Sequence, residues 1–477
     1  MIRSTMSTII KYTLIGGVLL TCLLCALIPL ILLVLRWHFG RKKVKNSSEV
    51  KSVGFFHPYC NAGGGGERVL WRAVQAYQQR YPDHELYVYT GDLDATPADI
   101  LKRVNNIFNI PVKNTLKFVY LHRRKWVEAD MYPYFTLLGQ SLGSVYLGFE
   151  ALTQLQPDIF IDTMGYAFTL PLFKYLGLCK VGCYVHYPTI TKDMLRRVSG
   201  RVLAHNNRNI IARSPFLTAA KLTYYKLFAL IYSWAGRTSQ TIMVNSTWTE
   251  DHVNSLWEVP LQTHRVYPPC DVEHLKTLKH ENIDTIRIIS VGQFRPEKDH
   301  PLQLRSLYEL RSMVSEQLWS KITLVFIGSC RNEEDRIRVK DMQDLCKHLS
   351  LEDNVEFQVN VSYEELLKQF SRGLIGLHAM WNEHFGIGVV ECMAAGLITV
   401  AHRSGGPLMD IIETSEGSRT GYLATTSEDY AHALLTILQL TREQMAIIRN
   451  AARASVDRFT SEEFQKDFIR ATQPLFT

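Results

Sequence analysis

Short apolar runs alternate with longer segments of helical periodicity along most of this chain. The runs are rich in aromatic or β-branched residues, a composition that favours strands. Strands that alternate with helices are typical of a parallel sheet with helices on both of its faces. The first half of the chain is therefore expected to contain strands at Val53–Phe56, Leu86–Tyr89, Ile159–Asp162, Val181–Val185 and Ile242–Val244.

The same pattern restarts after a polar stretch at Lys276–Asp284. A polar break between two α/β series indicates a domain boundary. We therefore expect two Rossmann-like α/β domains, at residues 51–280 and 281–460, that face each other across a cleft. The second series of apolar runs predicts strands at Ile286–Gly292, Ile322–Ile327, Val355–Val359, Leu374–His378 and Leu397–Val400.

A long uncharged stretch precedes the first domain. Residues 12–35 contain no charged residue, and a helix of this length, at about 1.5 Å per residue, can span a hydrocarbon core of about 30 Å. A cleaved signal peptide has a shorter apolar region and a small-residue cleavage site, and neither is evident here. Lys and Arg cluster between Arg36 and Lys45 and are sparse before residue 12. We expect one transmembrane helix at 12–35, with the domains on the cytosolic side.

The basic excess of the chain belongs to this N-terminal region. The first 51 residues carry eight Lys or Arg and one Glu, which accounts for the whole formal charge of +7. The two domains are therefore balanced in charge, which argues against nucleic-acid binding, because that needs a basic face. The nine cysteines are irregularly spaced, which favours buried reduced thiols in a cytosolic protein.

Two apolar segments of the first domain, Tyr132–Leu152 and Ile210–Ala235, differ from ordinary core helices. Both are rich in Phe, Leu and Tyr, and the second interleaves Lys221, Lys226 and Trp234 with them. Amphipathic helices with Lys and aromatic residues can lie in a membrane interface, whereas the simpler interpretation is a buried helix of the domain. The sequence leaves both interpretations open.

The candidate chemistry centres on the stretch Met380–Met409. Glu383 and Glu391 are separated by seven residues, and two glycines lie between them, within Phe385–Gly388. Apolar residues recur at helical spacing after these glycines, so a loop is expected to become a helix there. Free backbone N–H groups and the helix dipole favour anions at such a helix start. This stretch therefore suits a sugar nucleotide.

Three other segments contain candidate functional residues. For each of them a purely structural interpretation is also open. Gly63–Gly66 follow the first strand and precede a helix, which makes either a second phosphate cradle or a flexible turn. His186 follows a strand, at the end where open α/β sheets bind ligands, although such histidines are often structural. Arg295 and Lys298 lie in a loop that could stabilise a leaving diphosphate or form surface salt bridges.

The spacing of the two glutamates, the Phe-Gly-Ile-Gly between them and the later Ser404-Gly405-Gly406 resemble the donor site of retaining glycosyltransferases of family 4. This resemblance implies the GT-B architecture, with nucleotide bound by the second domain and acceptor mainly by the first. It also implies a final helix, at residues 461–477, that packs back on the first domain. The reaction is then expected to retain the donor's anomeric configuration and to need no metal ion or other cofactor.

The resemblance also implies roles for individual residues. Glu383 is expected to bind sugar hydroxyls, His186 to position the donor sugar, and Lys298 to stabilise the leaving diphosphate, which makes these three the catalytic candidates. Glu391 is expected to bind the ribose hydroxyls. The chain departs from the family at Gln293, where the family has Arg, so Arg295 becomes the candidate for that contact. The other donor-binding candidates are Gly64, Gly65, Phe385, Gly386, Ile387 and Gly388.

Further motifs narrow the resemblance to the members of family 4 that build the lipid-linked oligosaccharide of asparagine-linked glycosylation. These motifs are His57–Trp71, Phe135–Ser144, Met164–Tyr175, Tyr184–Ile190 and Val291–Gln303. The resemblance implies addition of the fourth and fifth mannoses, in α-1,2 linkage, from GDP-mannose to dolichol-diphosphate Man3GlcNAc2 on the cytosolic face of the endoplasmic reticulum membrane.

Other mannosyltransferases of that pathway are then candidate partners. Two alternatives stay open at this point. One is another membrane-bound family 4 transferase that uses a UDP-sugar donor and a lipid acceptor. The other is a noncatalytic glycosyltransferase-like scaffold, although a scaffold has no chemical need for Glu383, Glu391, Lys298 and His186 together.

Overall fold

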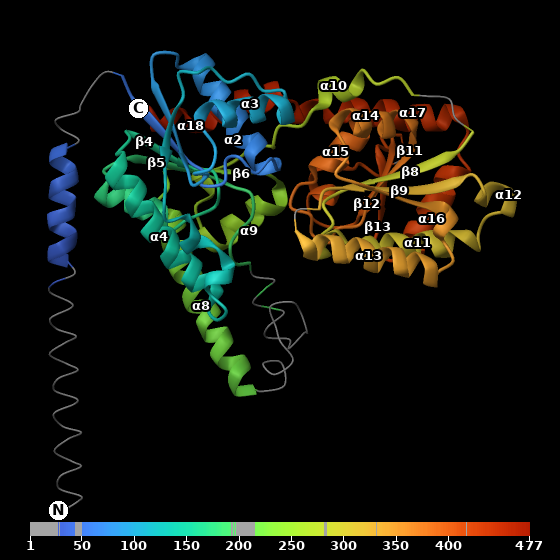
Figure 1. Cartoon of the computed structure of the whole chain (residues 1–477), viewed down its shortest axis with the longest axis horizontal. Helices are drawn as coiled ribbons and strands as arrows, with labels where there is room; N and C mark the ends of the chain where they lie inside the picture. Colours follow the sequence, from blue (N-terminus) through green and yellow to red (C-terminus); the bar gives the residue numbers. More distant parts are fainter. Residues whose placement is uncertain are drawn as a thin grey trace, which may run out of the picture.

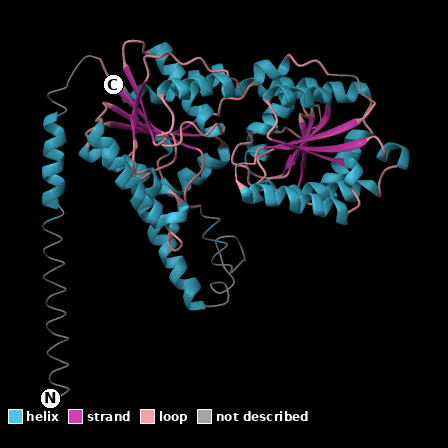
Figure 2. Ribbon diagram, in the orientation of Figure 1, coloured by secondary structure: helices cyan, strands magenta, loops and turns pink. Residues whose placement is uncertain are grey.

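Two parallel β-sheets form the cores of two α/β domains that lie side by side (Figure 1). The structure is a computed structural model, and it describes residues 27, 29–42, 50–191, 194, 196, 215–280, 284–330, 332–415 and 417–477. Each sheet lies between layers of helices, as Figure 2 shows. This arrangement confirms the two Rossmann-like domains predicted from the sequence.

The first sheet runs in the order β3-β2-β1-β4-β5-β6-β7, and its neighbouring strands are parallel. The strand order reverses between β1 and β4, and ligands bind open α/β sheets at the carboxyl ends of strands beside such a reversal. The strands are β1 (Ser52–Phe56), β2 (Glu85–Thr90), β3 (Lys117–Tyr120), β4 (Ile159–Asp162), β5 (Lys180–Val185), β6 (Thr241–Val244) and β7 (Thr263–Arg265). The helices around it are α2 (Gly65–Arg80), α3 (Pro97–Phe108), α4 (Thr136–Gln154), α5 (Thr169–Pro171), α8 (Pro215–Arg237) and α9 (Thr247–Trp257).

The second sheet runs in the order β10-β9-β8-β11-β12-β13 and is also parallel. Its order reverses between β8 and β11, so the carboxyl ends of both sheets can meet at one cleft. The strands are β8 (Ile286–Val291), β9 (Ile322–Gly328), β10 (Val355–Val359), β11 (Gly373–His378), β12 (Ile398–His402) and β13 (Gly421–Ala424). The helices are α10 (Val272–Lys276), α11 (His300–Arg311), α12 (Glu316–Trp319), α13 (Glu333–His348), α14 (Tyr363–Arg372), α15 (Ile387–Ala394), α16 (Ser427–Leu438) and α17 (Arg442–Ser455).

All the strands that the sequence pattern predicts are confirmed. The pattern does not predict β3, β7 and β13, each of which lies at an edge of its sheet. An edge strand has a neighbour on one side only and is covered less completely, so its sequence need not be a continuous apolar run. Lys117–Tyr120 and Thr263–Arg265 accordingly contain charged or polar residues.

The last helix, α18 (Ser461–Thr472), packs on the first domain against α2. Phe464 and Phe468 are buried in the core of that domain, and the Phe468 ring meets Tyr77 edge-on with centroids 5.7 Å apart. The chain therefore crosses between the domains twice. The buried carboxylate of Asp410 also links the two domains. It accepts hydrogen bonds from the Thr247 amide at 3.0 Å and from the Tyr267 hydroxyl at 2.9 Å.

The predicted transmembrane segment at 12–35 lies mostly outside the described residues. Among the residues that the structure does describe, no helix is both long enough and apolar enough to cross a membrane. Residues 29–42 are helical, and the end of this helix contacts the first domain. Phe39 is buried there, and an Arg36 guanidinium nitrogen donates to the Tyr175 carbonyl at 2.5 Å.

Helices α4 and α8 each combine a core face with an exposed apolar face. They lie side by side (Figure 1), and the Tyr224 hydroxyl of α8 accepts a hydrogen bond from the Leu138 amide of α4 at 3.2 Å. On α8 the buried aromatic side chains are Tyr225, Phe228 and Tyr232. The exposed apolar side chains are Leu227, Leu230, Ile231 and Trp234 of α8, and Leu138, Leu142 and Tyr146 of α4. The helices are therefore part of the core, and they also expose an apolar surface.

Candidate active site

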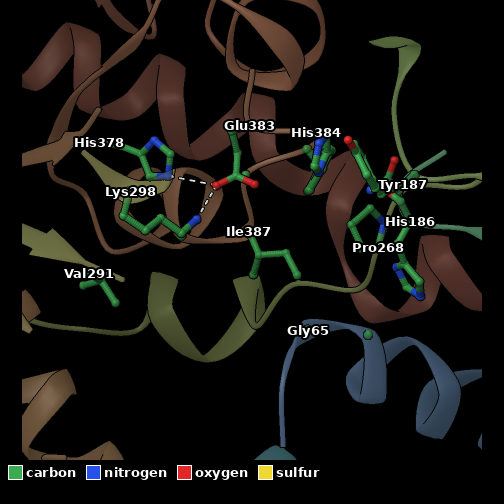
Figure 3. A pocket seen from close by; sticks show the side chains of 15 residues that line it. Gly65, His186, Tyr187, Pro268, Val291, Lys298, His378, Glu383, His384 and Ile387 are labelled. Atoms are coloured by element: carbon green, nitrogen blue, oxygen red, sulfur yellow. Dashed lines mark hydrogen bonds and ion pairs between the residues drawn. The ribbon is translucent and has the colours of Figure 1, made fainter. Parts of the chain in front are cut away.

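A cavity of about 280 Å³ lies between the two domains, at the carboxyl ends of their strands. Both domains line it, and Figure 3 shows their side chains converging on it. The lining residues are Gly65, Gly66, His186, Tyr187 and Asn245 of the first domain, Pro268 of the connection, and Val291, Lys298, His378, Glu383, His384, Phe385, Gly386, Ile387 and Gly388 of the second. Most of the predicted site residues thus meet in one cavity.

Two glycine-rich helix starts face each other across this cavity. Helix α2 begins at Gly65 and helix α15 at Ile387, directly after Gly386. Gly386 has a φ of +114°, which L side chains rarely adopt, so glycine is needed there. A Cβ atom on Gly65 would lie 2.8 Å from Ile387 Cδ1, too close for an unshifted side chain. The sequence therefore brings two sets of free N–H groups together, which favours an anion between them.

Glu383 is held by two partners at the centre of the cavity. Lys298 Nζ donates to its Oε2 at 2.5 Å, and His378 Nε2 donates to the same atom at 3.1 Å (Figure 3). Burial by itself would raise the pKa of Glu383, but the Lys298 charge and the His378 hydrogen bond outweigh it and hold that pKa below its usual value. Glu383 is therefore a carboxylate, which can accept hydrogen bonds from sugar hydroxyls.

His186 lies opposite, at the end of β5, where its Nε2 donates to the Thr163 carbonyl at 3.1 Å. Burial, together with the neighbouring His57, lowers the pKa of His186 to about 4. Burial likewise lowers the pKa of His384 to about 4. Both imidazoles are therefore neutral near pH 7, so His186 contributes position and dipole rather than charge.

A buried network supports the glycine turn of the first domain, and sequence reasoning missed it. Glu67, in the first turn of α2, accepts hydrogen bonds from the Gly64 amide and from His57 Nε2, the latter at 3.2 Å. His57 Nδ1 lies 2.9 Å from the hydroxyl of Thr163, whose carbonyl holds His186. Burial raises the pKa of Glu67, but the His57 hydrogen bond and the Gly64 amide outweigh it, so the pKa is lowered. Glu67 stands three residues after Gly64, a capping spacing that could have revealed it.

An aromatic cluster forms the side of the cavity next to Glu383. The Tyr187 ring lies 4.3 Å from the His384 ring, and Trp248 lies 4.9 Å from His384 (centroid distances). Trp248 is buried, whereas Tyr187 is 41% exposed. Nothing in the local sequence joins these three residues, because Tyr187 follows β5, Trp248 lies in α9 and His384 belongs to the other domain.

Three of the predicted donor-binding residues do not line the cavity. Gly64 directly precedes the lining residue Gly65 in the chain, and its backbone amide donates a hydrogen bond to the Glu67 carboxylate. Arg295 pairs with Glu297 at 3.6 Å. Glu391 lies one turn along α15 and pairs with Arg68 of α2 at 3.4 Å, and burial raises its pKa although Arg68 opposes this. Within the described residues, no group of three or more His, Cys, Asp or Glu side chains is arranged to hold a metal ion.

Comparison with protein families matches nearly the whole of both domains. Residues 50–257 match the family described as ALG11 mannosyltransferase N-terminus, and residues 275–454 match the family described as glycosyl transferases group 1. The chain is 51% identical over 460 residues to the GDP-Man:Man(3)GlcNAc(2)-PP-Dol alpha-1,2-mannosyltransferase of Xenopus laevis, which covers 95% of this chain and 94% of that one. Identity to the enzyme of the same name is 49% in Homo sapiens, covering 96% and 95%, and 45% in Dictyostelium discoideum, covering 92% and 87%.

Solved structures resemble the fold at much lower identity. A glycosyltransferase from Rickettsia africae superposes with a TM-score of 0.62 at 13% identity, covering 90% of this chain and 99% of that one. Anabaena HepE in complex with UDP and glucose superposes with a TM-score of 0.60 at 16% identity, covering 89% and 99%. These similarities establish the GT-B fold.

Proposed function

Because the chain belongs to the family of GDP-Man:Man(3)GlcNAc(2)-PP-Dol alpha-1,2-mannosyltransferases, we propose that it transfers mannose in α-1,2 linkage from GDP-mannose to dolichol-diphosphate Man3GlcNAc2. The observation that carries this proposal is the identity of about half the residues over nearly the whole chain, both domains included. The named activity of these relatives favours it over a UDP-sugar transferase and over a scaffold. The products carry a fourth and a fifth mannose.

The donor's diphosphate lies between the starts of α2 and α15, next to Lys298. Glu383 accepts hydrogen bonds from hydroxyls of the donor mannose, for which the carboxylate exchanges part of its contact with Lys298. Lys298 then turns to the diphosphate, on which negative charge grows as it leaves. Glu391 accepts the ribose hydroxyls. His186 positions the donor sugar by its neutral imidazole, and the backbone N–H groups of Phe385–Gly388 bind phosphate oxygens.

The bonds change on one face of the sugar. The acceptor hydroxyl oxygen bonds to the anomeric carbon while the bond from that carbon to the β-phosphate oxygen breaks. The leaving diphosphate keeps this electron pair and takes the hydroxyl proton on one of its oxygens, so the configuration is retained. We propose that this reaction proceeds without a metal ion, with Lys298 and the two helix starts offsetting the charge.

The exposed apolar faces of α4 and α8 support a membrane-bound enzyme. Leu230 is 69% exposed and Leu142 is 63% exposed. Exposed apolar patches of this kind mark sites that contact a membrane or another protein. We propose that these faces lie in the interface of the endoplasmic reticulum membrane, on its cytosolic side, with residues 12–35 as a single transmembrane anchor. A lipid-linked acceptor then reaches the cavity from the surface that holds the enzyme, where other mannosyltransferases of the pathway are candidate partners.

Transfer of labelled sugar tests the activity. Membranes containing the full chain are incubated with radiolabelled GDP-mannose, and separately with UDP-sugars, and a short-chain lipid-diphosphate trimannosyl-chitobiose. Wild type is expected to add two α-1,2-mannoses from GDP-mannose alone, and Glu383→Ala is expected to add none while keeping its melting temperature and membrane insertion. Transfer from a UDP-sugar would overturn the donor, and full activity of Glu383→Ala would overturn the site.

Protease treatment of sealed microsomes tests the orientation. Domains on the cytosolic side are digested by trypsin added outside, whereas luminal domains are protected until detergent is added. Complete protection before detergent would contradict the proposed placement.

A further inference from the structure

One basic side chain of the first domain contacts an acidic side chain of the second. Arg68 lies in the first turn of α2, and its Nη1 is 3.4 Å from Oε1 of Glu391 in α15. Both side chains are only 16% exposed. The Arg68 guanidinium also lies over the Phe108 ring, 5.6 Å from its centroid. The guanidinium is therefore held inside the gap between the two domains.

The starts of two helices make this gap a favourable place for an anion. The starts of α2 and α15 approach so closely that Gly65 meets Ile387, and Figure 3 shows Ile387 pointing toward the segment of Gly65. Two positive helix ends that face each other repel unless a negative group sits between them. Arg68 is one turn beyond Gly65, and Glu391 is one turn beyond Ile387. A diphosphate bound between the helix starts is therefore within reach of Arg68.

The loop that carries Lys298 supplies little other positive charge to the cavity. Its Arg295 is paired with Glu297 at 3.6 Å, and Gln293 is uncharged. Lys298 is itself bound to Glu383. A nucleoside diphosphate carries more than one negative charge when it leaves the sugar, and an Arg fork matches phosphate oxygens in pairs.

We propose that Arg68 is the second cation for the donor's diphosphate, supplied across the cleft by the first domain. This inference rests on the proposed function, in which the donor is a nucleoside diphosphate sugar. When the ribose hydroxyls take Glu391, Arg68 loses its partner and turns to the diphosphate. Its charge is thus paired both before and after the donor binds, and the first domain contributes chemistry as well as shape.

A simpler role for Arg68 predicts the opposite result. If Arg68 only ties the domains together through Glu391, it competes with the donor's ribose for that carboxylate. Its removal would then leave GDP binding unchanged or make it tighter, because Glu391 would be free. If Arg68 binds the diphosphate, its removal weakens GDP binding. The sign of the change therefore separates the two roles.

Calorimetric titration of the full chain in detergent with GDP and with guanosine makes this test. Arg68→Gln is expected to raise the Kd for GDP by about 10- to 100-fold, the usual effect of losing a charged hydrogen bond, and not to weaken guanosine binding. Arg68→Lys is expected to restore part of the loss. Arg80→Gln, at the exposed far end of α2, is the matched control and is expected to bind GDP as wild type does.

An unchanged or tighter Kd for GDP in Arg68→Gln would overturn the proposal, as would a loss in Arg295→Gln without one in Arg68→Gln. Melting temperatures check that each variant is folded, and a folded Arg68→Lys keeps the test decisive if Arg68→Gln does not fold. If wild type binds UDP instead of GDP, the proposed donor is wrong. The same comparison with UDP and uridine then still decides the role of Arg68.

Discussion

The two walls of the cavity, one from each domain, differ in the charge of the residues that line them. The wall of the second domain carries the charged pair Lys298 and Glu383, and most of its lining comes from one continuous stretch, Glu383–Gly388. The wall of the first domain is lined by Gly65, His186, Tyr187 and Asn245, which come from separate segments and carry no charge near pH 7. One wall therefore supplies charge, and the other supplies shape and neutral dipoles.

This difference teaches how the site divides its work. Charge that develops on a leaving diphosphate needs fixed opposite charge beside it, and the second domain offers that. An acceptor hydroxyl has to be held in line with the anomeric carbon, and the first domain offers surfaces for that. Arg68 is the proposed exception, since it would bring charge from the first wall to the second.

Removing Lys298 takes a positive charge from the wall of the second domain and should have the largest effect of the four changes that follow. Lys298→Ala is expected to lower kcat for mannose transfer by about 100- to 1000-fold, because the diphosphate loses a preorganised cation. Lys298→Arg should keep part of the rate. Transfer assays at saturating donor give kcat, and the melting temperature shows whether the variant is folded. A kcat within threefold of wild type in a folded Lys298→Ala would place the charge elsewhere.

Adding one methyl group tests the shape of the other wall. Gly65→Ala places a Cβ 2.8 Å from Ile387 Cδ1, closer than van der Waals contact, and such overpacking costs about 1–3 kcal/mol. We expect kcat/KM, measured in transfer assays, to fall by about tenfold. Ile387→Val removes Cδ1, so the double variant should recover most of the loss. Purely additive losses would show that the clash does not occur in the active form.

The hydrogen bonds of Glu67, which hold the glycine turn of the first domain, should matter less for activity and more for stability. Glu67→Gln keeps the side-chain size but removes the charge that accepts from Gly64 and His57, and we expect a loss of about 1–3 kcal/mol in the free energy of unfolding. The transfer rate should fall only a few-fold. Glu85→Gln breaks an exposed pair with Lys117 and is the matched control, expected to change stability by less than about 1 kcal/mol. Equal losses in the two variants would contradict a special role for Glu67.

The smallest effect concerns pH. His186 and His384 have pKa values of about 4 in the folded chain, so in the unfolded chain, where they titrate at about 6.5, they bind protons first as pH falls. Their contribution makes the free energy of unfolding fall as pH drops from about 6.5 toward 4, and leaves it constant above about 7. Melting temperatures at pH 7.5, 6 and 5 check this. His186→Asn should show a smaller decrease below pH 6.5, and an equal decrease would exclude His186 as a cause.

The comparison of the walls also explains what sequence reasoning could find. Glu383 and the Phe385–Gly388 helix start are neighbours along the chain, so their spacing carries the signal. The pairing of Arg68 with Glu391 joins residues that are 323 positions apart. The contact of Tyr187 with His384 also joins the two domains. No local pattern marks such pairs, because they form only when the domains meet.

Loop conformation is a second limit. Arg295 follows the strand β8 within a few residues of Lys298, and spacing alone gives both a chance to reach the diphosphate. In the structure, the short helical turn Pro296–Lys298 lets Lys298 reach Glu383, while Arg295 pairs with Glu297. Backbone dihedrals decide this, and the sequence pattern does not report them.

By itself, the sequence determined the alternation of buried strands and helices, and hence two parallel sheets, because burial on both faces requires continuous apolar runs. It also determined the glycine helix starts and the Glu383–Glu391 spacing, since both depend on residues close in sequence. Only the tertiary structure decided the edge strands, the pairing of Lys298 with Glu383, the reach of Arg68 and the aromatic side of the cavity. These depend on contacts between distant segments, whose free energy exists only once both domains are folded and in contact.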